Sequence, residues 1–112
     1  MSERDKTDSN APDGDLLLKE KETIKRPDMY RVLPLNDDYT PMEFVVWVLQ
    51  GVFYMQKEES VKVMLQVHKN GMGICGSYPY DVARTKVAQV DQASEKEGHP
   101  LQCKIEADAG AR

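Results

Sequence analysis

A run of polar side chains, Asn36, Asp37 and Asp38, stands directly before the most hydrophobic segment of the chain. Asn and Asp favour turns, and one such side chain can cap a helix, so a turn and a cap explain part of this run. A calcium loop would need oxygen ligands at alternating positions through a longer loop, and the sequence lacks them. The remaining acceptors are therefore candidates for binding a ligand.

His68 is a further candidate, at the C-terminal end of a predicted helix. There the helix dipole or a backbone carbonyl can satisfy an imidazole without any function. The possible zinc ligands His68, Cys75, His99 and Cys103 show no paired ligand spacing, and a Cys75–His68 nucleophilic pair has no further support. We therefore predict no metal and no cofactor, and interpret both cysteines as free, small buried hydrophobic residues.

Four apolar residues lie close in sequence to these polar groups: Met42, Val45, Met64 and Val67. Taken singly, each is explained as part of the hydrophobic core. Together with the acceptors of Asn36 and Asp37, they suit a ligand that carries a cationic amine next to a hydrophobic group. The first residue of a polypeptide has this chemistry, because its free α-amino group donates up to three hydrogen bonds.

The composition narrows the class of protein. A chain of 112 residues with 40% hydrophobic and 30% charged residues is typical of one soluble globular domain. Its net charge of −4 argues against nucleic-acid binding, which needs a basic patch. No apolar run approaches the roughly 20 residues that span a membrane, and the first residues lack the apolar stretch of a signal peptide. We expect a cytoplasmic protein without a membrane partner, monomeric by default.

Rigid elements must position the candidate side chains, and the first is a predicted strand over residues 29–35. Pro34 has no N–H group, so this strand is expected to lie at a sheet edge or to have its last residues unpaired. A helix follows, to about residue 53. Thr40 is its predicted N-cap, and Glu43 completes a capping box.

The remaining elements are a helix from residue 57 to 68 or 70, a strand over 72–78, a helix over 80–96 and a strand over 101–106. Residues 1–26 and 107–112 are predicted to be a disordered N-terminal extension and a disordered C-terminal tail, so the folded domain covers 27–106. The order strand–helix–helix–strand–helix–strand predicts a two-layer α+β domain, with helices on one face of a small sheet.

Four segments carry a resemblance to a known family: LNDDYTPMEFVV, VMLQVHKNGMGICGSY, TKVAQV and GHPLQCKIE. They resemble ClpS, the bacterial adaptor that delivers N-end-rule substrates to the Clp AAA+ unfoldase and protease, and the similarity covers about residues 27–106. The resemblance implies a three-stranded antiparallel sheet packed against three helices and no enzymatic activity. It also implies binding of proteins whose first residue is Leu, Phe, Trp or Tyr.

The resemblance further implies roles for individual residues. Asn36, Asp37 and His68 are expected to hold the α-amino group, while Asp38 and Thr40 shape the rim and hold the peptide backbone. The pocket for the first side chain is expected to be lined by Met42, Val45, Met64, Val67 and Leu101. Met42 is the expected gatekeeper that excludes the β-branched residues Ile and Val.

The expected partners are N-degron proteins and the N-terminal domain of a Clp unfoldase. By the resemblance, the unfoldase docks on the surface around the third helix, at Tyr78, Asp81 and Lys86. The extension 1–26 is long enough to assist the handover of substrate. Four positions differ from the residue types that the family leads us to expect: Pro34, Trp47, Asp81 and Arg84.

Two other functions are compatible with some of these residues. An enzyme acting at peptide N-termini would use His68 and Asp37 as acid and base, but the sequence supplies no nucleophile or metal for it. A domain resembling that of the ribosomal stalk would share the fold and have no affinity for short peptides. It gives no reason for Asn36, Asp37 and His68 to occur together.

Overall fold

The computed structural model describes residues 28–109, so the predicted extension 1–26 and residues 110–112 of the predicted tail lie outside it. The elements are β1 (Met29–Leu35), α2 (Met42–Gly51), α3 (Lys57–Asn70), β2 (Gly76–Pro79), α4 (Tyr80–Glu97) and β3 (Gln102–Ala107). Their order is the predicted one. No helix in this part of the chain is long and apolar enough to cross a membrane.

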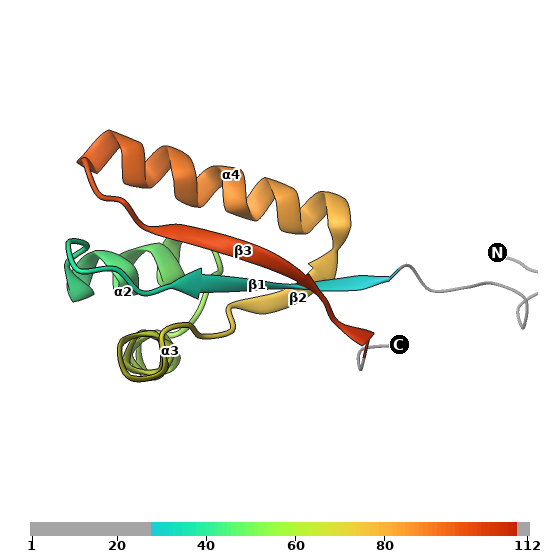
Figure 1. Ribbon diagram of the computed structural model, residues 1–112, viewed down its shortest axis with the longest axis horizontal. Coiled ribbons are helices and arrows are strands. Elements are labelled where there is room, and N and C mark those ends of the chain that lie inside the picture. The colour runs from blue at the N-terminus through green and yellow to red at the C-terminus, as the bar shows by residue number, and fades with distance from the viewer. Residues whose placement is uncertain (1–27, 110–112) are drawn as a thin grey trace, which may run out of the picture.

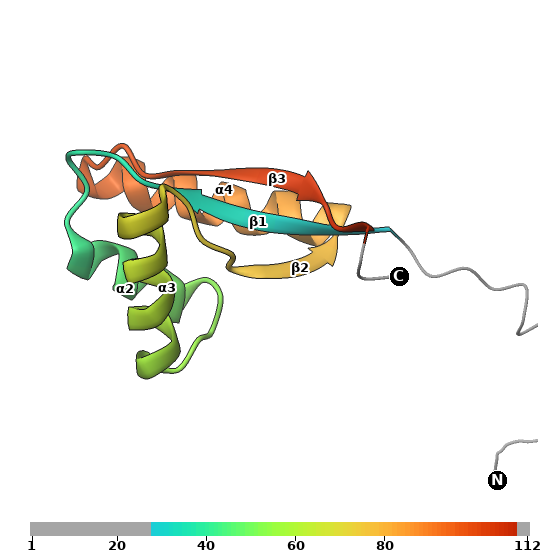
Figure 2. The same ribbon diagram turned by 60° about the horizontal axis from the view of Figure 1, so that its bottom comes forward.

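The three strands form one antiparallel sheet in the order β2–β1–β3, and α4 lies along one side of this sheet (Figure 1). α2 and α3 pack against each other near the end of β1 (Figure 2). The predicted α+β class with a three-stranded antiparallel sheet and three helices is therefore confirmed. The chain passes from β1 directly into the helix pair, so one short loop connects the sheet to α2.

One hydrophobic core joins the sheet to the helices. Val32 of β1, Leu49 of α2 and Val90 of α4 are at most 1% exposed, and α3 adds Val63 and Val67 to the same cluster. Valine loses side-chain freedom in a helix and is a weak helix former. Packing against this core, rather than intrinsic propensity, must therefore hold α2 and α3 in place.

β1 is the central strand, so the prediction of an edge strand is wrong. The Pro34 carbonyl accepts a hydrogen bond from the Gly73 N–H at 3.3 Å, on the side of β1 that faces β2. The missing N–H of Pro34 faces the same side, but β2 begins only at Gly76, beyond this point. The other predicted alternative, unpaired last residues, holds only on the side that faces β2. Pro34 and Leu35 pair with Cys103 and Gln102 of β3, whereas neither has a ladder partner within β2.

β2 is shorter than the predicted strand over residues 72–78. The residues before Gly76 still contact β1, because Met72 forms an isolated bridge with Leu35 and the Cys75 N–H donates to the Val32 carbonyl at 2.8 Å. A regular antiparallel pair exchanges bonds in both directions. Pro34 cannot return the bond that Gly73 gives, so this stretch does not become a continuous ladder.

α2 begins at Met42, and the predicted capping box is absent. The N-cap is Pro41, without a side-chain cap hydrogen bond. The Thr40 hydroxyl, which was expected to cap the helix, donates instead to the Asp37 carboxylate at 2.8 Å. A local hydrogen bond within the preceding loop has therefore replaced the cap, a competition that Asp and Thr side chains commonly create.

The other helix ends follow the sequence prediction. Gly71 and Gly98 terminate α3 and α4 in the left-handed conformation, with φ of 89° and 75°. At the C-terminus, the pairing extends past the predicted domain end at residue 106. Ala107 pairs with Tyr30, and the Asp108 N–H donates to the Met29 carbonyl at 2.8 Å. Ala107, the first residue of the predicted disordered tail, thus belongs to the sheet, and Asp108 is hydrogen-bonded to it.

Candidate functional site

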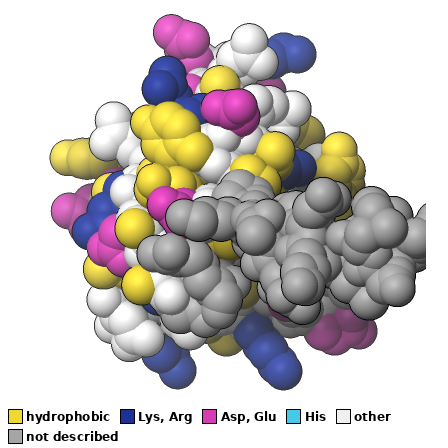
Figure 3. Space-filling view, turned by 90° about the vertical axis from the view of Figure 1, so that its right-hand side faces the viewer, with side chains coloured by type: hydrophobic (Ala, Val, Ile, Leu, Met, Phe, Trp, Pro, Cys, Tyr) yellow, Lys and Arg dark blue, Asp and Glu magenta, His cyan; other side chains and the backbone are white. Residues whose placement is uncertain are grey.

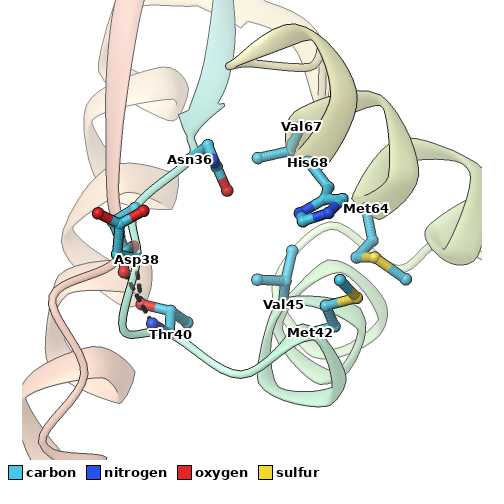
Figure 4. Close-up of a pocket in the computed structure, with 9 residues that line it drawn as sticks. Asn36, Asp38, Thr40, Met42, Val45, Met64, Val67 and His68 are labelled. Carbon is cyan, nitrogen blue, oxygen red and sulfur yellow. Dashed lines mark hydrogen bonds between the residues drawn. The ribbon is translucent and has the colours of Figure 1, made fainter.

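A cavity of about 260 Å³ opens where the end of β1 meets α2 and α3 (Figure 4). Its lining residues come from three separate segments: Asn36, Asp37, Asp38, Thr40, Met42, Val45, Met64, Val67 and His68. Every one of them was singled out from the sequence. The volume is below the roughly 300–1,000 Å³ of pockets that hold drug-sized molecules, so the cavity has the scale of one side chain.

The cavity has a polar side and an apolar side. The loop after β1 supplies the polar side, and the Asn36 side chain points from it toward the cavity (Figure 4). α3 lies opposite and presents His68, while Met42 and Val45 come from α2 (Figure 4). A ligand in this cavity therefore meets hydrogen-bonding groups from both the loop and α3, and apolar side chains from α2 and α3.

Asn36 is tied to α3 through its backbone, because its N–H donates to the Gly71 carbonyl at 2.9 Å. Its side-chain amide has no hydrogen-bond partner among residues 28–109, and the same holds for the His68 imidazole. Both side chains are exposed. Two hydrogen-bonding side chains at the cavity thus have no partner in the described part of the chain, and both can bond a ligand.

The Asp37 carboxylate organises the loop. One of its oxygens, Oδ1, accepts hydrogen bonds from the backbone N–H groups of Tyr39 at 2.8 Å and Thr40 at 2.7 Å. The other, Oδ2, accepts the Thr40 hydroxyl. An ionised carboxylate has about four acceptor positions, so one position on Oδ2 stays open for a ligand.

The environment of Asp37 keeps it ionised. Partial burial alone would raise the pKa of this carboxyl, but the hydrogen bonds from Thr40 and Tyr39 and the nearby His99 together lower its pKa below the ordinary 3.8. At neutral pH the cavity therefore carries a fixed negative charge. Such a charge favours a cationic ligand group.

The apolar side of the cavity combines rigid and accessible residues. Val45 and Val67 are 7% and 3% exposed and belong to the core, so they form fixed walls. Met64 is half-buried, and Met42 is 45% exposed. Methionine is flexible and adapts to the shape of its contacts. Its exposure places Met42 on the open side of the cavity.

Leu101 was expected in this pocket, but it is not among the residues that line the cavity. It is 3% exposed and lies in the core cluster together with Val45. It stands just before β3 in the sequence. It therefore belongs to the same core as the cavity walls Val45 and Val67.

The expected docking residues gather at another place. The Lys86 ammonium donates to the Val52 carbonyl at 2.8 Å and lies 5.8 Å from the centre of the Tyr78 ring. Asp81 is exposed in the first turn of α4. The face at this end of the molecule has hydrophobic side chains beside Lys, Arg and acidic ones (Figure 3). Tyr78 and Lys86 are thus brought together, on a mixed surface.

Tyr54 was missed by the sequence analysis. It is 78% exposed, adopts a positive φ of 57°, and its ring lies 4.6 Å from the Lys86 ammonium. A bulky residue with positive φ is a backbone outlier, and such outliers concentrate at functional surfaces. The sequence offers no signal for this position, because the contact joins segments that are 32 residues apart.

Arg84 and Trp47, two of the positions with unexpected residue types, both lie on the surface. The Arg84 guanidinium stands 5.8 Å from the Tyr80 ring centre. Trp47 is 59% exposed. Packing in the core therefore does not account for either side chain.

Neither cysteine lines the cavity. Burial raises the pKa of the Cys75 thiol far above its ordinary range and that of the Cys103 thiol to about 12. Both thiols are consequently protonated at neutral pH and are poor nucleophiles. Within residues 28–109, no group of three or more His, Cys, Asp or Glu side chains could hold a metal ion.

Comparisons with known proteins agree with this geometry. The family profile of the ATP-dependent Clp protease adaptor protein ClpS matches residues 25–104. The chain is 50% identical over 109 residues to the ClpS protein of Maricaulis maris, covering 96% of this chain and 100% of the relative. It is 53% identical over 94 residues to that of Herminiimonas arsenicoxydans, covering 84% and 92%.

A solved structure is also similar. Agrobacterium tumefaciens ClpS2 bound to L-phenylalaninamide matches with a TM-score of 0.72 and 37% sequence identity, covering 74% of this chain and 100% of that chain. Fold, sequence and family profile thus point the same way, and the alternative of an enzyme acting on peptide N-termini is excluded. The chain belongs to the family of ATP-dependent Clp protease adaptor proteins ClpS, which are adaptors and not enzymes.

Proposed function

We propose that this adaptor binds polypeptides whose first residue is Leu, Phe, Trp or Tyr and delivers them to a Clp AAA+ unfoldase and protease. One observation carries the proposal. The cavity joins unused hydrogen-bonding groups and a fixed carboxylate to an apolar hollow of the size of one side chain. That ClpS2 from Agrobacterium tumefaciens holds L-phenylalaninamide, a free amine next to a benzyl group, supports it.

The α-amino group needs three acceptors in fixed directions. The Asn36 carbonyl oxygen, the open position on Asp37 and an unprotonated nitrogen of His68 are suited to supply them. Asp37 is ionised, which makes its bond to an ammonium group charge-assisted and stronger than a neutral one. An acetylated N-terminus has lost both the charge and two donors, so its binding would leave acceptors unpaired at about 1–3 kcal/mol each.

The first side chain is proposed to enter the apolar part of the cavity, between Met42, Val45, Met64 and Val67. Burying a large apolar side chain contributes about 1.5–3 kcal/mol. Val45 and Val67 belong to the packed core and cannot move aside. Met42 then acts as the gatekeeper, because a branch at the Cβ atom of the ligand would meet it at the opening. Asp38 and Thr40 form the rim along which the peptide backbone leaves.

Delivery requires a second surface for the unfoldase. Tyr78, Asp81 and Lys86 are proposed to dock on its N-terminal domain, and Tyr54 joins them through its contact with the Lys86 ammonium. Tyr54 and Tyr78 give this surface the aromatic side chains that are enriched at protein interfaces. The extension 1–26 is proposed to assist the handover.

Fluorescence anisotropy of peptides labelled at the C-terminus tests the proposal. Peptides that begin with Phe, Leu, Tyr or Trp are expected to bind, and those that begin with Val, Arg or acetyl-Phe are expected to remain free. Asn36→Ala should weaken Phe-peptide binding roughly 10- to 100-fold, the loss of one bond to a charged group. Because the Asn36 backbone holds the loop, the side chain can be removed without releasing it.

Asn70→Ala is the matched control. Asn70 is an exposed amide at the end of α3 that does not line the cavity, so its removal should leave the affinity unchanged. If no peptide binds, or if acetyl-Phe binds as well as Phe, the amine-reading mechanism is wrong. Complete absence of peptide binding would favour the stalk-like interaction domain instead.

A further inference from the structure

A second hollow lies on α2, on the side turned away from the cavity. It has a volume of about 300 Å³ and is lined by Glu43, Phe44, Trp47 and Glu97. Trp47 is the only tryptophan of the chain and is 59% exposed. None of these four residues lines the first cavity, so the function proposed above does not explain them.

The aromatic side chains of this hollow are held in place. The Trp47 ring stacks on Phe44 with 5.7 Å between ring centres and 28° between planes. Phe44 packs against the core and meets the His99 ring edge-to-face at 4.6 Å. The indole is therefore supported from below, while more than half of its surface faces solvent. A supported, exposed indole is a preformed platform for a flat or cationic group.

Two carboxylates flank this platform. Neither Glu43 nor Glu97 forms an ion pair with any residue between 28 and 109. Glu43 has a structural reason to be acidic, since it lies in the first turn of α2 where the helix dipole favours negative charge. Glu97 has none, because it is the last residue of α4, where the dipole disfavours a carboxylate. A cation bound beside Glu97 would relieve this cost.

We propose that this hollow, named here the Trp47 hollow, binds an arginine side chain of a partner polypeptide, independently of the cavity for the first residue. A guanidinium group is planar, stacks on aromatic faces and bonds carboxylates through two parallel N–H groups. It would lie on the Trp47 ring, between Glu43 and Glu97. Lysine is the weaker ligand, because a compact ammonium cannot both stack on the indole and bond a carboxylate with two donors.

The test titrates the full chain with the peptide acetyl-Gly-Ser-Arg-Ser-Gly-amide and follows Trp47 fluorescence. The acetyl group keeps the peptide out of the first cavity. A saturable change is expected with arginine. Binding should be weakened by roughly 5-fold or more when citrulline, the neutral analogue of the same shape, replaces arginine, and lost when glutamate does. The arginine affinity should fall with added NaCl, as between exposed charges.

Variants assign the site. Glu97→Gln keeps the reporter and should weaken arginine-peptide binding roughly 3- to 10-fold. Glu58→Gln removes an exposed glutamate of α3 outside the hollow and should have no effect. Trp47→Leu, measured by anisotropy of a labelled peptide, should abolish binding. L-phenylalaninamide, which fills the first cavity, should not displace the arginine peptide.

Three results would overturn the inference: no response to the arginine peptide, equal binding of the citrulline peptide, or unchanged binding by Glu97→Gln. Displacement by L-phenylalaninamide would also overturn it, since the peptide would then occupy the first cavity. If the arginine peptide does not bind, the Phe peptide is still expected to bind in the anisotropy measurement. The two experiments therefore distinguish failure of this inference from failure of the proposed function.

Discussion

The Asp37 carboxylate holds the loop that forms the polar side of the cavity. It accepts hydrogen bonds from two backbone N–H groups and from the Thr40 hydroxyl, and its lowered pKa keeps it charged. A ligand that meets this loop finds acceptors already oriented. Folding has already ordered this loop and its acceptors. Binding a ligand therefore costs less conformational entropy than it would with a flexible loop.

Asp37→Ala is expected to reduce the free energy of unfolding by about 1 kcal/mol at pH 7, the typical effect of losing such a cap-like carboxylate. Because the folded-state pKa lies below the ordinary 3.8, this stability is present above pH 3.8. It is lost as the pH falls through the folded-state pKa. Urea unfolding at pH 7 and at pH 3 measures the difference, which should shrink at the lower pH.

Asp38→Ala provides the comparison for that experiment. The Asp38 side chain makes no hydrogen bond within residues 28–109, so its removal should not change stability at either pH. Equal losses for both variants would show that general charge on the loop, rather than the hydrogen bonds of Asp37, stabilises the fold.

Met42→Ala is expected to relax specificity. Removing a side chain on the open side of the cavity makes room for a branched Cβ, so peptides that begin with Ile or Val should bind at least roughly 5-fold more tightly than they bind the wild type. Phe-peptide affinity should fall, because apolar contacts are lost. Anisotropy with the same peptide set measures both changes. Met72→Ala, an exposed methionine outside the cavity, should alter neither.

At the scale of elements, the sequence predicted what depends on local pattern. α3 and α4 follow from apolar periodicity and end at Gly71 and Gly98, which adopt positive φ as C-cap glycines do. The central position of β1 could not be predicted, because it depends on which side of the strand the missing Pro34 donor faces. Register and strand order are tertiary properties that a proline alone does not determine.

In the candidate site, too, the residues could be predicted from the sequence, whereas some of their contacts could not. Eight of its nine residues were singled out from residue type and position, the resemblance added Thr40 and gave all nine their roles, and the structure brings them to one cavity. Leu101 was misplaced, because a buried leucine beside the site and a lining leucine have the same signature in the sequence. The prediction that Thr40 caps α2 was wrong for a related reason. Its hydroxyl donates to the Asp37 carboxylate instead, and the capping-box motif does not indicate this hydrogen bond.

Gly71 connects α3 to the cavity and provides an element-scale prediction. Its φ is 89°, and its carbonyl accepts the Asn36 N–H. Gly71→Ala forces a Cβ into the left-handed region and should cost about 1 kcal/mol of unfolding free energy. Chemical denaturation measures the loss, and the accompanying strain on the Asn36 loop should weaken Phe-peptide binding.

Gly51→Ala is the matched control for that change. Gly51 is the last residue of α2, has no heavy atom within 4 Å of an added Cβ and does not adopt a positive φ. Alanine there should leave stability unchanged or raise it by up to about 1 kcal/mol. A loss at Gly51 as large as the one at Gly71 would contradict the conformational explanation.

At the scale of the whole molecule, the cavity and the proposed docking surface lie at opposite ends of β1. Tyr78 pairs with Tyr30 near the start of the strand, whereas Asn36 follows its last residue. Asn36 follows Tyr30 by six positions along the chain, or roughly 20 Å at about 3.3 Å per residue. An adaptor needs this separation, because it must hold a substrate and an unfoldase at the same time.

Because the two surfaces are separated, we expect that peptide binding and unfoldase binding can each be removed without the other. Lys86→Glu breaks the contacts with the Val52 carbonyl and the Tyr54 and Tyr78 rings. It should weaken binding to the N-terminal domain of a Clp unfoldase at least roughly 10-fold while changing Phe-peptide affinity less than about 2-fold. Asn36→Ala should do the reverse. Calorimetry with the isolated unfoldase domain and anisotropy with the peptide measure the two affinities separately.

The double variant makes the prediction sharper. Changes more than about 10 Å apart add within about 0.3–0.5 kcal/mol, so Asn36→Ala with Lys86→Glu should show each single loss unchanged. A Lys86→Glu protein that also loses peptide affinity would mean that Lys86 acts through α2, by way of Val52, on the Met42 end of that helix. Thermal unfolding of the variant then separates the two causes: a lowered melting temperature indicates damage to α2, and an unchanged one indicates real coupling between the surfaces.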